Sequence, residues 1–116
     1  GFGLLGHLKE MCENSDVSSK INFQDLLFLD GAKELAMSGV MPGGTRRNLK
    51  SVEKIVSFSE QISEVEQLLS ADAQTSGGLL ISMPLEDAKS YVKNGNDTTV
   101  IIGEITEKKS PLIRVI

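Results

Sequence analysis

The chain has 116 residues, of which 40% are hydrophobic, 24% charged and 4% aromatic, and its formal net charge at pH 7 is −4. This length indicates one domain with its own core, because a chain of this size removes roughly two-thirds of its surface from water on folding. The acidic balance argues against nucleic acid as a partner. No apolar stretch approaches the ~20 residues of a membrane span. The single cysteine, Cys12, and the lack of an export signal predict a cytoplasmic protein.

The first residues form a glycine-rich stretch and do not include an initiator methionine. Three of the first six residues are glycine, as in the middle of a turn. We therefore expect the chain to be the trailing part of a longer protein.

Helical spacing of apolar residues predicts a first helix over residues 4–13, and alternating apolar residues predict a short strand that ends at Phe23. Residues 25–29 are expected to form one helical turn. A second helix is expected to begin at Asp30 and to end at Gly39. Its common face would carry Ala32, Leu35 and Ala36.

The break at Pro42 is followed by a third predicted helix, for which Thr45 is the expected N-cap. The buried positions of this helix would be Leu49, Val52, Ile55 and Val56. A fourth helix is predicted from the capping box formed by Ser63 and Glu66, in which each side chain satisfies a free backbone N–H of the other residue. Val65, Leu68 and Leu69 would be its buried stripe.

The last third of the chain predicts three more strands and a helix. Residues 79–83 are an uninterrupted apolar run after a polar loop, which favours a central strand. The helix expected after Pro84 would turn Ala88, Tyr91 and Val92 inward. Residues 98–105 and 112–116 are rich in β-branched side chains, and the charged turn between them predicts a hairpin. Four strands with helices between and around them indicate an α+β fold.

Gly1, Gly3 and Gly6 satisfy the pattern G-x-G-x-x-G. A dinucleotide-binding site also needs a preceding strand and a well-placed acidic residue about 20 residues later, and Asp25 fits that place only loosely. We therefore favour close packing of a helix start against a neighbouring segment. Even so, free backbone N–H groups at a helix start can bind an anion.

Residues 43–48 are more informative because they place two arginines in the first turn of a predicted helix. The helix dipole is positive at that end and favours acidic residues, so local stability alone would not select arginine. Arginine holds phosphate through two parallel hydrogen bonds, which predicts an anion site here. The alternative is that both arginines pair with surface carboxylates. The candidate residues are Gly43, Gly44, Thr45, Arg46, Arg47 and Asn48.

A second loop with small and hydroxyl side chains spans residues 72–78, and its candidate residues are Thr75, Ser76, Gly77 and Gly78. Its glycines permit a ligand or another domain to approach the backbone closely. Ser76 lacks the surrounding pattern of a nucleophile, so a tight turn or a domain contact is the favoured interpretation. His7 is expected to be a partly buried histidine, with a role against phosphate as the alternative. Cys12 is expected to be a core thiol, and no metal site is predicted in the chain.

Four segments in this order and spacing resemble selenophosphate synthetase, also called selenide, water dikinase. They are GFGLLGHL at residues 1–8, GGTRRNL at 43–49, QTSGGLL at 74–80 and IGEI at 102–105. The resemblance is to the C-terminal domain of that enzyme. It implies that residues 1–116 are one domain of a two-domain enzyme, with the mixed sheet and flanking helices of the aminoimidazole ribonucleotide synthetase C-terminal type.

The resemblance also implies an activity, cofactors and partners. The whole enzyme would make selenophosphate from selenide, ATP and water, and would release AMP and phosphate. It would use Mg²⁺ and be a homodimer. The reactive Cys or selenocysteine, its partner Lys and most metal-binding aspartates of the family lie in the N-terminal half, and one aspartate ligand lies just before the position of Gly1. A proline common after the aspartate of the second loop is Ala73 here.

From these features, the 116 residues alone are expected to bind no cofactor and to be inactive. Phosphate would meet residues 43–48, while the chain would contact its own N-terminal domain. Two other interpretations remain open. One is another enzyme of the aminoimidazole ribonucleotide synthetase superfamily, and the other is a non-catalytic phosphate-binding or interaction module.

Overall fold

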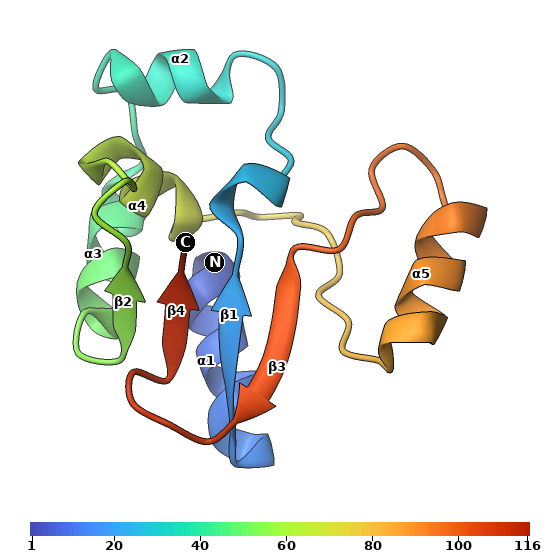
Figure 1. Cartoon of the computed structure of the whole chain (residues 1–116). Coiled ribbons are helices and arrows are strands. Elements are labelled where there is room, and N and C mark those ends of the chain that lie inside the picture. Colours follow the sequence, from blue (N-terminus) through green and yellow to red (C-terminus); the bar gives the residue numbers. More distant parts are fainter.

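One four-stranded sheet forms the centre of the computed structural model, which describes all residues from Gly1 to Ile116 (Figure 1). The strands are β1 (Val17–Ile21), β2 (Val56–Phe58), β3 (Gly103–Glu107) and β4 (Ile113–Val115). The α-helices are α1 (Gly3–Ser15), α2 (Ala32–Met37), α3 (Gly43–Val52), α4 (Glu64–Ser70) and α5 (Leu85–Asn94), and a short 3₁₀ helix, η1, spans Phe23–Asp25.

The sheet is mixed, with the strand order β2-β4-β1-β3. β4 runs parallel to both of its neighbours, whereas β3 runs antiparallel to β1 at one edge. Helices lie beside this sheet, so the expected α+β class with a mixed sheet and flanking helices is confirmed. None of the helices has the length and apolar character that a membrane span requires.

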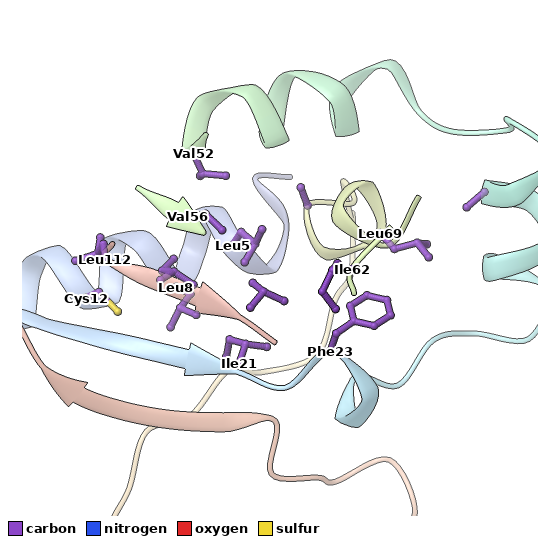
Figure 2. Packing of buried hydrophobic residues seen from close by; sticks show 14 residues of the cluster. Leu5, Leu8, Cys12, Ile21, Phe23, Val52, Val56, Ile62, Leu69 and Leu112 are labelled. Carbon is purple, nitrogen blue, oxygen red and sulfur yellow. The ribbon is translucent and has the colours of Figure 1, made fainter. Parts of the chain in front are cut away.

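The hydrophobic core lies between the sheet and α1, with α3 and α4 closing one side (Figures 1 and 2). Leu5, Leu8 and Cys12 of α1 are each at most 2% exposed, because spacings of three and four residues place them on one face of the helix. Burying a leucine side chain contributes about 1.5–3 kcal/mol, so this face anchors the helix. Cys12 is therefore a core thiol, as predicted.

The capping box of α4 is present as the sequence predicts. The backbone N–H of Ser63 donates to Oε2 of Glu66 at 2.8 Å, and the backbone N–H of Glu66 donates to Oγ of Ser63 at 3.3 Å. The hydrogen bond from the Ser63 backbone, with that from its side chain, lowers the pKa of Glu66 below its ordinary value. The start of α4 is thus determined by local chemistry alone.

The prediction of a central strand at residues 79–83 is wrong. The segment makes no backbone–backbone hydrogen bond, and Leu79 is 90% exposed. β4 and β1 occupy the central places of the sheet, while residues 79–83 lead away from it to α5 (Figure 1). A short apolar run is consistent with a strand but does not show which other strand, if any, it pairs with.

The prediction of a hairpin at the end of the chain is also wrong, because β1 lies between β3 and β4. The connection from β3 to β4 passes the start of β1 and is held there by Ser18, which is fully buried. Oγ of Ser18 donates to the carbonyl of Lys109 at 2.9 Å and accepts from the N–H of Lys109 at 2.8 Å. The predicted strand at residues 98–105 is reduced to β3, which begins at Gly103.

Three other boundaries differ from the prediction. The helical turn expected at residues 25–29 lies earlier, at η1, and the preceding strand ends at Ile21 rather than Phe23. The third helix ends at Val52, so Ile55 and Val56 are not on it. Residues 56–58 instead form β2, because they pair in parallel with β4, a non-local pairing that helical spacing cannot reveal.

Leu35, expected on the inner face of α2, is 54% exposed, so the prediction for this side chain is wrong.

Helix α5 exists as predicted, but its apolar face is not buried. No residue of α5 is buried, and Tyr91 is 52% exposed. Figure 1 shows α5 standing apart from the sheet, joined to it by two extended connections. Its apolar face, residues 79–83 and β3 line a cavity of about 640 Å³. The expectation that Ala88, Tyr91 and Val92 face the core is therefore wrong, since an amphipathic pattern identifies a face but not what covers it.

Candidate functional site

Helix α3 begins three residues earlier than the sequence predicted. The N-cap is Pro42, with φ −60° and ψ 141°, and the helix begins at Gly43. Thr45 is the third residue of the helix and not its N-cap, so that prediction is wrong. Proline suits this place because its φ is fixed and the N–H that it lacks would have no helical partner. No side chain caps the start of α3.

Thr45 and Asn48, two candidates for phosphate binding, face inward and hold neighbouring segments. The side chain of Thr45 is fully buried, and its Oγ1 donates to Oδ1 of Asp72 at 2.6 Å. The N–H of Ala73 donates back to Oγ1 of Thr45 at 3.3 Å. Nδ2 of Asn48 donates to the carbonyl of Gly1 at 2.8 Å and to that of Ala71 at 3.1 Å. These contacts fix α3 to two other parts of the chain.

Arg46 and Arg47 are exposed, and neither forms an ion pair. The guanidinium of Arg47 lies over the start of its own helix: a Cβ atom on Gly43 would be 3.7 Å from Nη1, and one on Gly44 would be 3.9 Å from Nη2. The alternative in which both arginines pair with carboxylates is thus not seen. The unpaired guanidinium of Arg47 therefore lies at the positive end of the helix, and Arg46 adds a second unpaired positive charge to the same helix.

The loop at residues 72–78 meets α3 only at its beginning. A Cβ atom on Gly44 would lie 3.4 Å from Cβ of Ala73, so these two backbones are in close contact. The remaining candidates, Thr75, Ser76, Gly77 and Gly78, are exposed and lead away toward α5. Ser76 makes no side-chain hydrogen bond, so no group activates it as a nucleophile.

Of the three opening glycines, Gly3 packs closely against a neighbouring segment, as the favoured interpretation predicted. Gly3 has φ +73°, and a Cβ atom there would lie 2.7 Å from the carbonyl oxygens of both Ala71 and Asp72. This close approach requires glycine irrespective of any nucleotide. His7 is exposed, not partly buried as expected, with Nδ1 3.6 Å from the carboxylate of Glu10 and its ring 5.8 Å from that of Phe2.

The structure therefore brings the beginnings of three motifs together: Gly1 and Gly3, the first turn of α3, and residues 71–73. It does not bring His7 or residues 75–78 into this contact. Two residues of this contact were not among the predicted site residues: Asp72, which contributes its side chain, and Ala71, which contributes its carbonyl. The only local signal for Asp72 is its place at the start of a glycine-ended loop.

The cluster suits an anion better than a cation. Its outward side chains are guanidinium groups at a helix N-terminus, which stabilise phosphate oxygens. No three His, Cys, Asp or Glu side chains lie close enough together to bind a metal ion. Fixed positive charge at this place is of the kind that stabilises phosphate oxygens.

The known proteins that are similar to this chain have the name of the family that its motifs resemble. No protein-family model matches the chain. A selenide, water dikinase from Aliarcobacter butzleri is 44% identical over 109 residues, which cover 90% of this chain and 31% of that protein. One from Clostridioides difficile is 40% identical and covers 100% of this chain and 34% of that protein. One from Campylobacter jejuni is 40% identical over 94% of this chain.

The similarity extends over nearly the whole chain, while the chain spans about a third of the length of the curated relatives that it matches. The chain is therefore a homologue of the selenide, water dikinases that corresponds to about one third of such a protein.

Proposed function

We propose that the chain is the C-terminal domain of an enzyme that makes selenophosphate from selenide, ATP and water, and that Arg46 and Arg47 face its phosphate-bearing cleft. The observation that carries the second part is the pair of exposed arginines without carboxylate partners at the start of α3. The names of the relatives support the first part, and favour it over other activities of the same superfamily.

The arginines would act by fixed positive charge. Several phosphate groups must be held together while negative charge moves between them, and preoriented cations stabilise that charge without reorganisation. The guanidinium of Arg47 lies over Gly43 and Gly44. It would bind the same phosphate as the backbone N–H groups at the start of that helix. Mg²⁺ would be held by residues of the longer protein outside this chain, and the proposed N-terminal domain would supply the reactive Cys or selenocysteine.

The test is to remove both charges in the full-length protein with the substitutions Arg46→Ala and Arg47→Ala together. Loss of preorganised charge stabilisation of this kind lowers the rate by about 100-fold or more, so we expect such a fall in kcat/KM for selenide-dependent AMP release. Lys50→Ala, which removes an exposed positive charge from the last turn of the same helix, is the matched control and should leave the kinetics unchanged. Unaltered kinetics in the double variant would refute the proposed role.

The remaining features of the proposal follow from the family. The domain would work in the cytoplasm, against its own N-terminal domain and within a homodimer. A non-catalytic phosphate-binding module is the second candidate, because the same arginines would serve it. The coding sequence upstream separates the two: a Cys or selenocysteine near a Lys in a glycine-rich segment, with several aspartates, supports the enzyme, and their absence supports the module.

A further inference from the structure

Asp72 is the meeting point of the three motif segments that the structure brings together. Its carboxylate accepts from Thr45 of α3 at 2.6 Å, and its backbone carbonyl lies where a Cβ atom on Gly3 would be only 2.7 Å away. The adjacent residues take part as well, since the Ala71 carbonyl accepts from Asn48 and the Ala73 N–H donates to Thr45. Residues 71–73 therefore contact the starts of both α1 and α3.

The hydrogen bonds between α3 and residues 71–73 involve buried groups and a charge. Thr45 is fully buried, and its hydroxyl both donates to Asp72 and accepts from Ala73. A hydroxyl that donates to a carboxylate makes a shorter and stronger hydrogen bond than one between neutral groups. If the carboxylate is removed, the buried hydroxyl loses its acceptor, and such an unsatisfied group destabilises the arrangement that contains it.

These contacts also determine which way the arginines point. Successive helical residues are rotated by 100°, so Thr45 and Asn48, three positions apart, share one face, while Arg46 and Arg47 between them turn to the other side. With the inner face fixed to residues 71–73 and to the carbonyl of Gly1, the first turn of α3 can neither rotate nor slide without breaking hydrogen bonds. The side of the helix from which both arginine side chains leave the backbone is thus determined by these hydrogen bonds.

We propose that Asp72 is a positioning residue, which acts through Thr45 to hold Arg46 and Arg47 in the orientation that phosphate requires. The proposal rests on the proposed function of the two arginines. Asp72 itself does not touch phosphate in this scheme, because its carboxylate faces the buried hydroxyl and its charge would repel an anion. A displacement of about 1 Å at such a site can lower a rate by up to about 100-fold.

The experiment uses the full-length protein with Asp72→Ala, alone and combined with the Arg46→Ala and Arg47→Ala pair. We expect Asp72→Ala to lower kcat/KM for AMP release about tenfold or more, and to add no further loss when the arginines are already absent, since both changes then remove one interaction. Asp72→Asn keeps an acceptor oxygen for Thr45 and should recover most of the rate. Asp87→Ala, at an exposed acidic position in α5, is the matched control and should have no effect.

If Asp72→Ala does not fold, Thr45→Val and Thr45→Ser give the same comparison, because only serine retains the hydroxyl. An active Asp72→Ala variant would overturn the positioning role, as would a loss that multiplies fully with that of the arginine variant. Both results would leave the proposed role of the arginines standing. Unchanged kinetics in the arginine variant itself would refute the proposed function and the positioning role together.

Discussion

Gly3 is the residue at which the backbone tolerates least change. It combines φ +73° with two carbonyl oxygens at 2.7 Å from the position of a Cβ atom. Gly31 is a natural comparison, because it has φ +81° but no atom within 4 Å of that position. The two glycines separate the cost of a left-handed backbone from the cost of a steric clash.

We predict that Gly3→Ala lowers the free energy of unfolding by roughly 2–5 kcal/mol, the sum of left-handed strain and overpacking. Gly31→Ala should cost only the strain, about 1–2 kcal/mol. Urea denaturation followed by circular dichroism measures both values. Equal costs at the two positions would show that the contact between Gly3 and residues 71–72 does not constrain the chain.

At the scale of elements, the capping box of α4 links stability to pH. Its hydrogen bonds lower the pKa of Glu66 in the folded protein. A carboxyl group with a lowered folded-state pKa stabilises the protein above its unfolded-state pKa, and this stabilisation is lost as the pH falls through the folded-state value. The contribution of the ionised Glu66 carboxylate should therefore be complete at pH 7 and be lost in acid, while the backbone N–H of Glu66 can still donate to Ser63.

We predict that Ser63→Ala lowers the free energy of unfolding by about 1 kcal/mol at pH 7. The difference from the unaltered chain should shrink when the pH is taken below the ordinary pKa of Glu66. Thermal unfolding at a series of pH values is the measurement, and Ser63→Asn is the control, because asparagine caps helices about as well as serine and does not titrate. A deficit that does not change with pH would contradict the contribution of Glu66.

Elements whose signals are local could be predicted, and elements that depend on distant partners could not. Helix α1 and the start of α4 follow from helical spacing and from Ser63 with Glu66. β2 could not be predicted, because it depends on pairing with β4, more than 50 residues away from Phe58 along the chain. Residues 79–83 have the composition of a strand but no pairing partner in the sheet, and composition alone does not reveal this. The arginine pair was found because it violates a local preference. The inward-facing role of Thr45 could not be predicted, because its partner Asp72 lies 27 residues away along the chain.

At the scale of the whole molecule, the start of α3 would form one wall of the active site that we propose. The chain places exposed arginines at the start of α3, and no three of its His, Cys, Asp or Glu side chains lie close enough together to bind a metal ion. Its formal net charge of −4 also makes the arginine pair a local exception. Chemistry at this wall would need groups from the remainder of the longer protein.

We predict that the 116 residues alone release no AMP from ATP in the presence of selenide, because positive charge without metal and nucleophile does not supply the reaction. The measurement is AMP formation by the purified chain, with the full-length protein as the positive control. Turnover of ATP that depends on selenide and is lost on Arg46→Ala and Arg47→Ala would contradict this prediction.

The unpaired segment at residues 79–83 has a consequence for handling the chain. Four of its five residues are apolar, the exception being Ser82, it carries no charge and no proline, and its backbone makes no hydrogen bond to another backbone group. The outer edge of β3 is free as well. Segments of this composition add to the strand edges of neighbouring molecules and start aggregation. We expect this segment to limit the solubility of the isolated chain. The substitution Leu79→Lys, at an exposed position, should raise that solubility.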